Sequence, residues 1–355
     1  MAEILGLGVT HYPGLMAPDD QMAAILEKTL ASAQVPAEMK SPERWPPQMR
    51  EEYLANRDLS VTREHRRRCL DAFRKVRAAL DAFAPDFVLI WGDDQYENFR
   101  DDGIPPFCIF ALDEIESRPF QRRSFWKPGN IWNEPNETPF RSRGHAVAGS
   151  FLAAELLRAG FDISYAYKMR YEHGLPHAFI NALLLLDCDR KGFSYPVVPF
   201  HVNCYGSSVI AKRGTAAHLD GLNLGQIDPP SPSPARCFDI GAATARILDA
   251  SPWRVALLAS SSWSHAFLSQ NNHCLFPNVD ADRARFEELR DGTFGLWRNL
   301  TTAQVEGAGQ HEFLNWVCLA GAMSALGRRA EIVDYVETYI LNSDKCFAIF
   351  PAGSA

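Results

Sequence analysis

The stretch Gly6-Leu-Gly-Val-Thr-His11-Tyr-Pro13-Gly14 constrains the fold more than any other part of this 355-residue chain. The apolar run 4–9 predicts a buried strand, and Pro13-Gly14 predicts a turn directly after it. His11 then lies at the carboxyl end of the strand, which is where open α/β sheets bind ligands. A single histidine there suits either metal binding or a hydrogen-bonded structural role, so the rest of the chain has to decide.

Apolar runs of strand length alternate with amphipathic helical segments along the rest of the chain. This order predicts an α/β fold, with a central mixed sheet and helices on both of its faces. We expect one catalytic domain over 1–355, with a helical insert at about 19–83, a long ordered loop at about 121–144 and a helical final third. Further strands are expected at 87–91, 107–111, 162–167, 195–200 and 253–260.

The charge and the cysteines exclude several classes of protein. A net charge of −7 and a pI near 5.8 argue against nucleic-acid binding, which depends on neutralising phosphates. No apolar run approaches the roughly 20 residues that span a bilayer, and the first residues lack the pattern of a signal peptide. The eight cysteines include no Cys-x-x-Cys pair. They are expected to be reduced thiols, so we expect a cytoplasmic protein that binds neither nucleic acid nor membrane.

Two more strands end in residues that can carry chemistry. The strand 87–91 leads into Gly92-Asp93-Asp94-Gln95-Tyr96, where adjacent acids suit either a ligand site or a helix cap. The strand 253–260 leads into Ser264-His265, where small hydroxyl residues leave room for a ligand beside the imidazole. His265 is therefore a candidate for acid–base catalysis.

Two residues fit the same edge of the sheet less directly. Glu312 precedes an apolar helix, where a carboxylate is costly to bury unless it is paired or binds a metal. Stabilisation by the helix N-terminus is the alternative for Glu312. His201 follows the strand 195–200 and suits either substrate binding or a structural role.

His173 and His177 lie four residues apart, but Gly and Pro stand between them, so a helical metal-binding pair is not expected. His173 better suits a hydrogen bond to an anionic ligand at the mouth of a helix. The chain contains no Walker loop, Gly-x-Gly-x-x-Gly, Gly-x-Ser-x-Gly or His-Glu-x-x-His motif. Phosphate cradles, dinucleotide sites, serine hydrolases and zincins therefore lose support.

Together, these segments resemble the type III extradiol ring-cleavage dioxygenases, the family of the protocatechuate 4,5-dioxygenase catalytic subunit. The resemblance covers most of the chain outside 19–83 and 121–144, and it rests on the order of several short motifs. It implies that His11, in His11-Tyr-Pro13, and Glu312, shortly before Trp316, bind iron. It also implies that His265 is the acid–base group and that His173 contacts substrate or oxygen.

One position departs from the family. A second iron-binding histidine is expected in a Gly-x-Asp-His-Tyr pattern, where this chain has Gln95. A glutamine carbonyl can bind a hard divalent metal, although less tightly than imidazole binds iron. Asp94 can complete the site instead of Gln95, or the metal has been lost.

The resemblance implies a non-haem Fe(II) enzyme that cleaves a catechol-type ring with O2, with Mn(II) or another divalent metal as alternative cofactor. Its partners would be a small aromatic substrate, O2 and further copies of the chain in a homo-oligomer. His201 and Asp94 are the expected substrate-binding residues, with Arg122, Arg123, Trp126 and Lys127 as further candidates in the long loop. Two alternatives remain: a divalent-metal hydrolase, and a metal-free aromatic-binding protein of the same fold.

Overall fold

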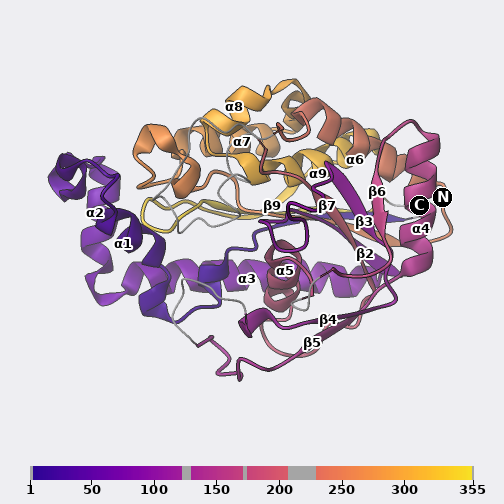
Figure 1. Ribbon diagram of the computed structural model, residues 1–355, viewed down its shortest axis with the longest axis horizontal. Helices are drawn as coiled ribbons and strands as arrows, with labels where there is room; N and C mark the ends of the chain where they lie inside the picture. The colour runs from indigo at the N-terminus through magenta and orange to yellow at the C-terminus, as the bar shows by residue number, and fades with distance from the viewer. Residues whose placement is uncertain (1–2, 122–128, 171–173, 207–228, 354–355) are drawn as a thin grey trace.

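The computed structural model describes residues 3–121, 129–170, 174–206 and 229–353. Ten strands are found in these residues: β1 Ile4–Val9, β2 Phe87–Gly92, β3 Phe107–Phe110, β4 Glu114–Ser117, β5 Phe140–Arg143, β6 Ser164–Ala166, β7 Val197–Val202, β8 Val255–Ser260, β9 Glu331–Val336 and β10 Lys345–Phe350. Eight of them form one sheet in the order β6-β3-β7-β2-β8-β1-β10-β9, and β4 pairs with β5 in a separate ribbon (Figure 1).

The large sheet is mixed. Strands β1, β8, β2 and β7 are parallel to their neighbours in the centre, whereas β3 runs antiparallel to β7 and β10 runs antiparallel to β1 and β9. This confirms the predicted α/β class with a mixed sheet.

The prediction of a helical final third is confirmed for residues 279–325 but misses β9 and β10, which form a two-stranded edge of the sheet. Residues 331–336 read Glu-Ile-Val-Asp-Tyr-Val, and their β-branched and aromatic side chains favour a strand although polar and apolar positions do not alternate. The partner of β10 is β1, at the other end of the chain, so local sequence does not indicate the pairing.

Helices cover both faces of the sheet (Figure 1). The α-helices of the described residues are α1 Ala24–Ala31, α2 Pro47–Ala55, α3 Ser60–Phe83, α4 Ala146–Arg158, α5 His177–Leu186, α6 Pro234–Asp249, α7 Val279–Arg290, α8 Thr302–Gly307 and α9 Leu314–Ala325. One core lies under α4, α6 and α9, and a second core lies under α3 and α5, so these helices bury their apolar sides against the strands. None of the helices in the described ranges is long and apolar enough to cross a bilayer.

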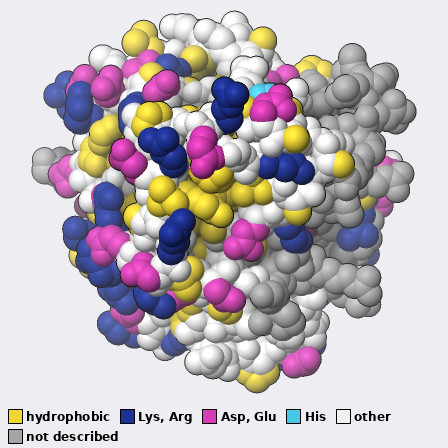
Figure 2. Space-filling view, turned by 90° about the vertical axis from the view of Figure 1, so that its left-hand side faces the viewer, with side chains coloured by type: hydrophobic (Ala, Val, Ile, Leu, Met, Phe, Trp, Pro, Cys, Tyr) yellow, Lys and Arg dark blue, Asp and Glu magenta, His cyan; other side chains and the backbone are white. Residues whose placement is uncertain are grey.

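Helix α3 has a buried apolar side and an exposed charged side. Cys69, Phe73, Val76 and Leu80 recur at helical spacing and are fully buried. On its solvent face, Arg67 pairs with acids one turn away, and such exposed pairs contribute roughly 0–1 kcal/mol each. Figure 2 shows basic and acidic side chains interspersed around an apolar patch on one face of the molecule.

Gly8 allows α9 to lie directly on β1. A Cβ atom at Gly8 would overlap the indole ring of Trp316, so this position has no room for a side chain. The indole nitrogen of Trp316 donates a hydrogen bond to the Ser261 carbonyl at 3.0 Å. This close approach brings the residues before α9 to the carboxyl end of β1.

Candidate metal centre

Several residues of the candidate site directly follow three adjacent parallel strands, β1, β8 and β2. In the sheet β8 lies between β1 and β2, with Val9 opposite Ser260 and Trp91 opposite Ala259. The residues that follow these strands therefore meet at one edge of the sheet, as predicted from their positions at strand ends.

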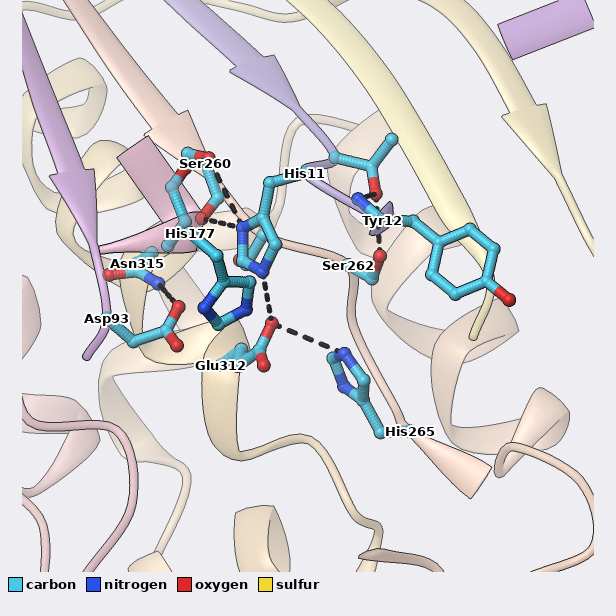
Figure 3. A network of polar contacts seen from close by, with 12 residues as sticks. His11, Tyr12, Asp93, His177, Ser260, Ser262, His265, Glu312 and Asn315 are labelled. Atoms are coloured by element: carbon cyan, nitrogen blue, oxygen red, sulfur yellow. Dashed lines mark hydrogen bonds and ion pairs between the residues drawn. The ribbon is translucent and has the colours of Figure 1, made fainter. Parts of the chain in front are cut away.

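Four side chains converge at this edge (Figure 3). His11, Asp93, His177 and Glu312 each offer one ligand atom, and these atoms all lie within 4.8 Å of one another. His11 follows β1, Asp93 follows β2, His177 begins α5, and Glu312 lies in the 3-10 turn His311–Phe313 before α9. Two imidazoles and two carboxylates are a donor set that suits Fe(II), Mn(II) or Zn(II).

Glu312 is fully buried and lies at the centre of the group. Its Oε2 is 3.1 Å from Nε2 of His11 and 3.3 Å from Nε2 of His265. Its Oε1 accepts hydrogen bonds from the hydroxyl of Tyr205 and, at 3.0 Å, from Nε2 of Gln95. Burial would raise the pKa of Glu312, but the neighbouring His265 and His11 hold the pKa of this carboxyl well below its usual range.

The ring of His11 is fixed with Nε2 toward Glu312. Its Nδ1 lies 2.9 Å from the Ser260 carbonyl oxygen, and its own carbonyl accepts a bond from Asn181 at 3.2 Å. Burial lowers the pKa of His11, but the charge and hydrogen bond of Glu312, the charge of Asp93 and the Ser260 carbonyl together outweigh burial and raise the pKa to about 9. Without a cation, His11 is therefore the imidazole that carries a proton, and a metal would take the place of that proton.

Asp93 indicates that a cation fits the group. It is fully buried, its Oδ1 accepts a 3.3 Å bond from Asn315, and its Oδ2 has no hydrogen-bond partner among the described residues. Burial and the charge of Glu312 raise the pKa of Asp93 well above its usual range. Two buried carboxylates this close repel each other, and a divalent cation would balance both charges.

His265 lies beside the four-residue group. Its backbone N–H donates to the Gly309 carbonyl at 3.0 Å, and the next N–H, of Ala266, donates to the Asn342 carbonyl at 2.6 Å. Burial lowers the pKa of His265, against an opposing effect of Glu312. Its imidazole is therefore neutral near pH 7, which is the form that can accept a proton.

Gln95 and Asp94 lie nearby but outside the four-residue group. Gln95 donates its amide to Tyr205 at 2.5 Å and to Glu312. Both carboxylate oxygens of Asp94 accept backbone N–H groups, from Glu97 and from Asn98, each at 2.8 Å. Asp94 thus caps the turn after β2, and capping was one of the two roles that the sequence left open for the adjacent acids. The substrate-binding role of Asp94 stays a prediction.

His201 and His173 complete the predicted set. His201 is buried at the end of β7 with its ring centroid 4.6 Å from that of Phe99, outside the four-residue group. Burial lowers the pKa of His201 to about 3. His173 lies outside the described residues, as do Arg122, Arg123, Trp126 and Lys127 of the long loop.

Sequence reasoning missed Asp93 and His177 as members of the group. The signal for Asp93 was its position directly after β2, where either of two adjacent acids can point inward. His177 was set aside because Gly and Pro precede it, yet this break starts α5 at His177 and turns its ring toward His11. The two rings meet edge to face, with their centroids 5.0 Å apart.

Sequence comparisons relate this chain to known ring-opening dioxygenases. Residues 226–343 match the family model described as the catalytic LigB subunit of aromatic ring-opening dioxygenase, a region that includes His265 and Glu312. A 2,3-dihydroxyphenylpropionate/2,3-dihydroxicinnamic acid 1,2-dioxygenase from Burkholderia vietnamiensis is 26% identical over 288 residues, which cover 74% of this chain and 83% of the relative. A Rhodococcus protein of the same name is 26% identical over 286 residues, covering 72% and 82%.

A crystal structure of an uncharacterized Escherichia coli K12 protein aligns with 80% of this chain and 92% of its own, with 11% identity and a TM-score of 0.48. The family model and the curated relatives carry the assignment, and they confirm the resemblance predicted from the sequence. In sequence, this chain is similar to aromatic ring-opening dioxygenases of the type III extradiol kind.

Proposed function

We propose that this protein is a non-haem Fe(II)-dependent extradiol dioxygenase that opens the ring of a catechol-type compound with O2. The observation that carries the proposal is the group of His11, Asp93, His177 and Glu312, in which all but His177 are buried, with the neutral imidazole of His265 beside it. A metal site with an adjacent base is what deprotonation of a catechol requires.

The group would hold iron through His11 and Glu312, with Asp93 and His177 available as further donors. Iron(II) is favoured over zinc because the homologues are named dioxygenases, and zinc has no redox chemistry. When bound, the iron would supply the Lewis-acid and redox chemistry that ring opening by O2 requires.

A side chain of the protein, His265, would transfer the protons of the reaction. His265 Nε2 faces the carboxylate of Glu312, so it can accept a proton from a catechol hydroxyl at this edge and later return it to the product. The bridge between His265 and Ser343 holds the base against the segment before β10. His173 is the proposed contact to substrate or oxygen.

The relatives supply the first substrate to test. They are named for 2,3-dihydroxyphenylpropionate and the corresponding cinnamic acid. We propose a catechol of this class, with a carboxylate-bearing side chain next to the hydroxyl pair. His201 and Asp94 stay proposed substrate-binding residues. Each also has a structural contact, His201 with the ring of Phe99 and Asp94 with the backbone of the turn after β2.

Two further proposals concern the whole molecule. We expect a homo-oligomer, which native mass spectrometry would detect. We also expect a cytoplasmic location, because all eight cysteines lie in the described ranges and carry free thiols.

The deciding experiment loads the purified protein with Fe(II) without oxygen and then measures O2 uptake with a panel of catechols. We expect one O2 consumed per substrate and both atoms of ¹⁸O2 in the ring-opened product. Glu312→Gln should abolish uptake, whereas Glu331→Gln, an exposed position on β9, should not change it. Metal binding and ester hydrolysis without O2 uptake would instead indicate a hydrolase.

A further inference from the structure

We propose that His177 supplies the second imidazole of the metal centre, held by Glu97, and that Gln95 has become a positioning residue for Glu312. This inference rests on the proposed function only in assuming that the group binds a divalent cation. It concerns which residues touch that cation, and neither the homologues' names nor the family match assigns this.

The first observation is the way both imidazoles are held. His11 has its Nδ1 on the Ser260 carbonyl, and His177 has its Nδ1 2.9 Å from Oε2 of Glu97. A histidine that binds a metal through one nitrogen typically donates its other ring N–H to a carboxylate or a backbone carbonyl. Both rings follow this rule, so Nε2 is the nitrogen that each can offer to a cation.

The second observation is that Glu97 is itself fixed in place. The backbone N–H of His177 lies 3.0 Å from each carboxylate oxygen of Glu97, in addition to the ring contact. Asp94 accepts the backbone N–H of Glu97 and so caps the turn that presents this carboxylate. The turn after β2 therefore orients the first residue of α5.

The third observation concerns Gln95. Its amide nitrogen lies 2.5 Å from the hydroxyl oxygen of Tyr205 and 3.0 Å from Oε1 of Glu312, while that hydroxyl donates to the same Oε1. The Tyr205 hydroxyl has a single proton, which it donates to Glu312, and the carboxylate has none. Turning the amide over would therefore place its carbonyl oxygen against two acceptors, so the amide nitrogen faces Glu312. Gln95 and Tyr205 together engage Oε1 and leave Oε2 facing the centre.

We infer from these contacts that the second histidine ligand comes from α5 and not from position 95. The histidine expected at position 95 is missing, and an imidazole from α5 reaches the group instead, with its ring edge to face against His11. Asp93 adds a second carboxylate, one buried oxygen of which has no hydrogen-bond partner in the described part of the chain. The predicted ligand set is therefore His11, His177, Glu312 and Asp93.

The test measures binding of Co(II) or Mn(II), which does not depend on turnover. We compare His177→Ala, Gln95→Ala and Glu97→Gln with Gln48→Ala, an exposed position on α2, as the matched control. We expect His177→Ala to weaken binding at least 100-fold and to change the visible absorption of bound Co(II), because an imidazole leaves the metal. Gln95→Ala and Glu97→Gln should weaken binding about 10–100-fold without changing the Co(II) spectrum.

The opposite pattern would overturn the proposal: a changed Co(II) spectrum in Gln95→Ala with an unchanged one in His177→Ala. Unfolding of the metal-free variants is measured in parallel, and His177→Asn replaces His177→Ala if the latter does not fold. If the wild-type protein binds Co(II) in the predicted way but cleaves no catechol, the ligand assignment stands and the proposed function fails.

Discussion

Oε2 of Glu312 lies 3.1 Å from Nε2 of His11, although the two residues come from opposite ends of the chain. The contact exists because β1 and β8 are neighbours in the sheet and because Gly8 lets α9 settle directly on β1. A bound divalent cation would replace the proton that now makes this pair attractive.

Metal should stabilise the folded protein through this pair. At a free metal concentration about 100 times the dissociation constant, binding adds roughly 2.7 kcal/mol to the free energy of unfolding. We expect the thermal midpoint to rise with Mn(II) and to fall back with a chelator. Glu312→Gln should show no such rise, whereas Glu331→Gln should behave like the wild type. A Glu312→Gln protein that gains as much as the wild type would contradict the assignment of Glu312.

His265 should matter for turnover and not for metal binding. Its Nε2 faces Glu312, and its neutral imidazole can accept a proton near pH 7. We expect His265→Ala to lower kcat by about 10²–10⁴-fold while the bound metal per chain stays at the wild-type value. Steady-state O2 uptake and metal analysis on the same samples check this. Undiminished turnover in His265→Ala, or in the more conservative His265→Gln, would remove the acid–base role.

The sequence indicated His11, Glu312 and His265 because each combines a reactive side chain with a strand end or the start of an apolar helix. It did not separate Asp93 from Asp94. Which of two adjacent acids points inward depends on the turn that follows, and the backbone N–H groups of Glu97 and Asn98 bind Asp94. The hydrogen bonds to Asp94 form only when the turn after β2 is folded, so the sequence alone does not show that Asp93 is the acid that points into the site.

His177 and the last two strands were missed for a related reason. His177 reaches the site through the position of α5 on the sheet and through Glu97, a contact between residues far apart in sequence. Strand β10 forms because β1 offers a free edge, with Gly6 opposite Phe350. Local periodicity predicts elements well, but it does not indicate which distant edges will pair.

His201 should make the protein sensitive to acid. Burial lowers its pKa to about 3 in the folded state, against 6.5 for the ordinary group. Since the unfolded chain takes up the proton first, stability is lost as the pH falls below 6.5, by up to about 1.4 kcal/mol per pH unit. We expect His201→Phe, which can still pack against Phe99, to flatten this loss between pH 6.5 and 4.5.

Denaturant unfolding over that pH range measures the effect of His201→Phe. His273→Asn, at an exposed histidine, should keep the wild-type slope. The same His201→Phe protein tests the substrate role of His201: an unchanged KM for the catechol would support a structural residue, and a KM raised tenfold or more would support substrate binding.

Asp282 is expected to position the base. It is fully buried on α7, both of its oxygens accept the backbone N–H of Ser264 at 3.1 Å, and Gln310 donates to it at 2.6 Å. It thereby joins the segment that carries His265 to the turn that carries Glu312. Asp282→Asn places an amide N–H2 against donors that then lose their acceptor, at a cost of about 1–3 kcal/mol of stability.

If this connection positions His265, Asp282→Asn should lower kcat about tenfold at unchanged metal content and shift the pH profile of kcat, because the imidazole moves relative to Glu312. Asp280→Asn is the matched control, since Asp280 lies on the same helix with its side chain 93% exposed. A variant that unfolds earlier but turns over at the wild-type rate per bound metal, with the wild-type pH profile, would show that Asp282 stabilises the fold without positioning the base.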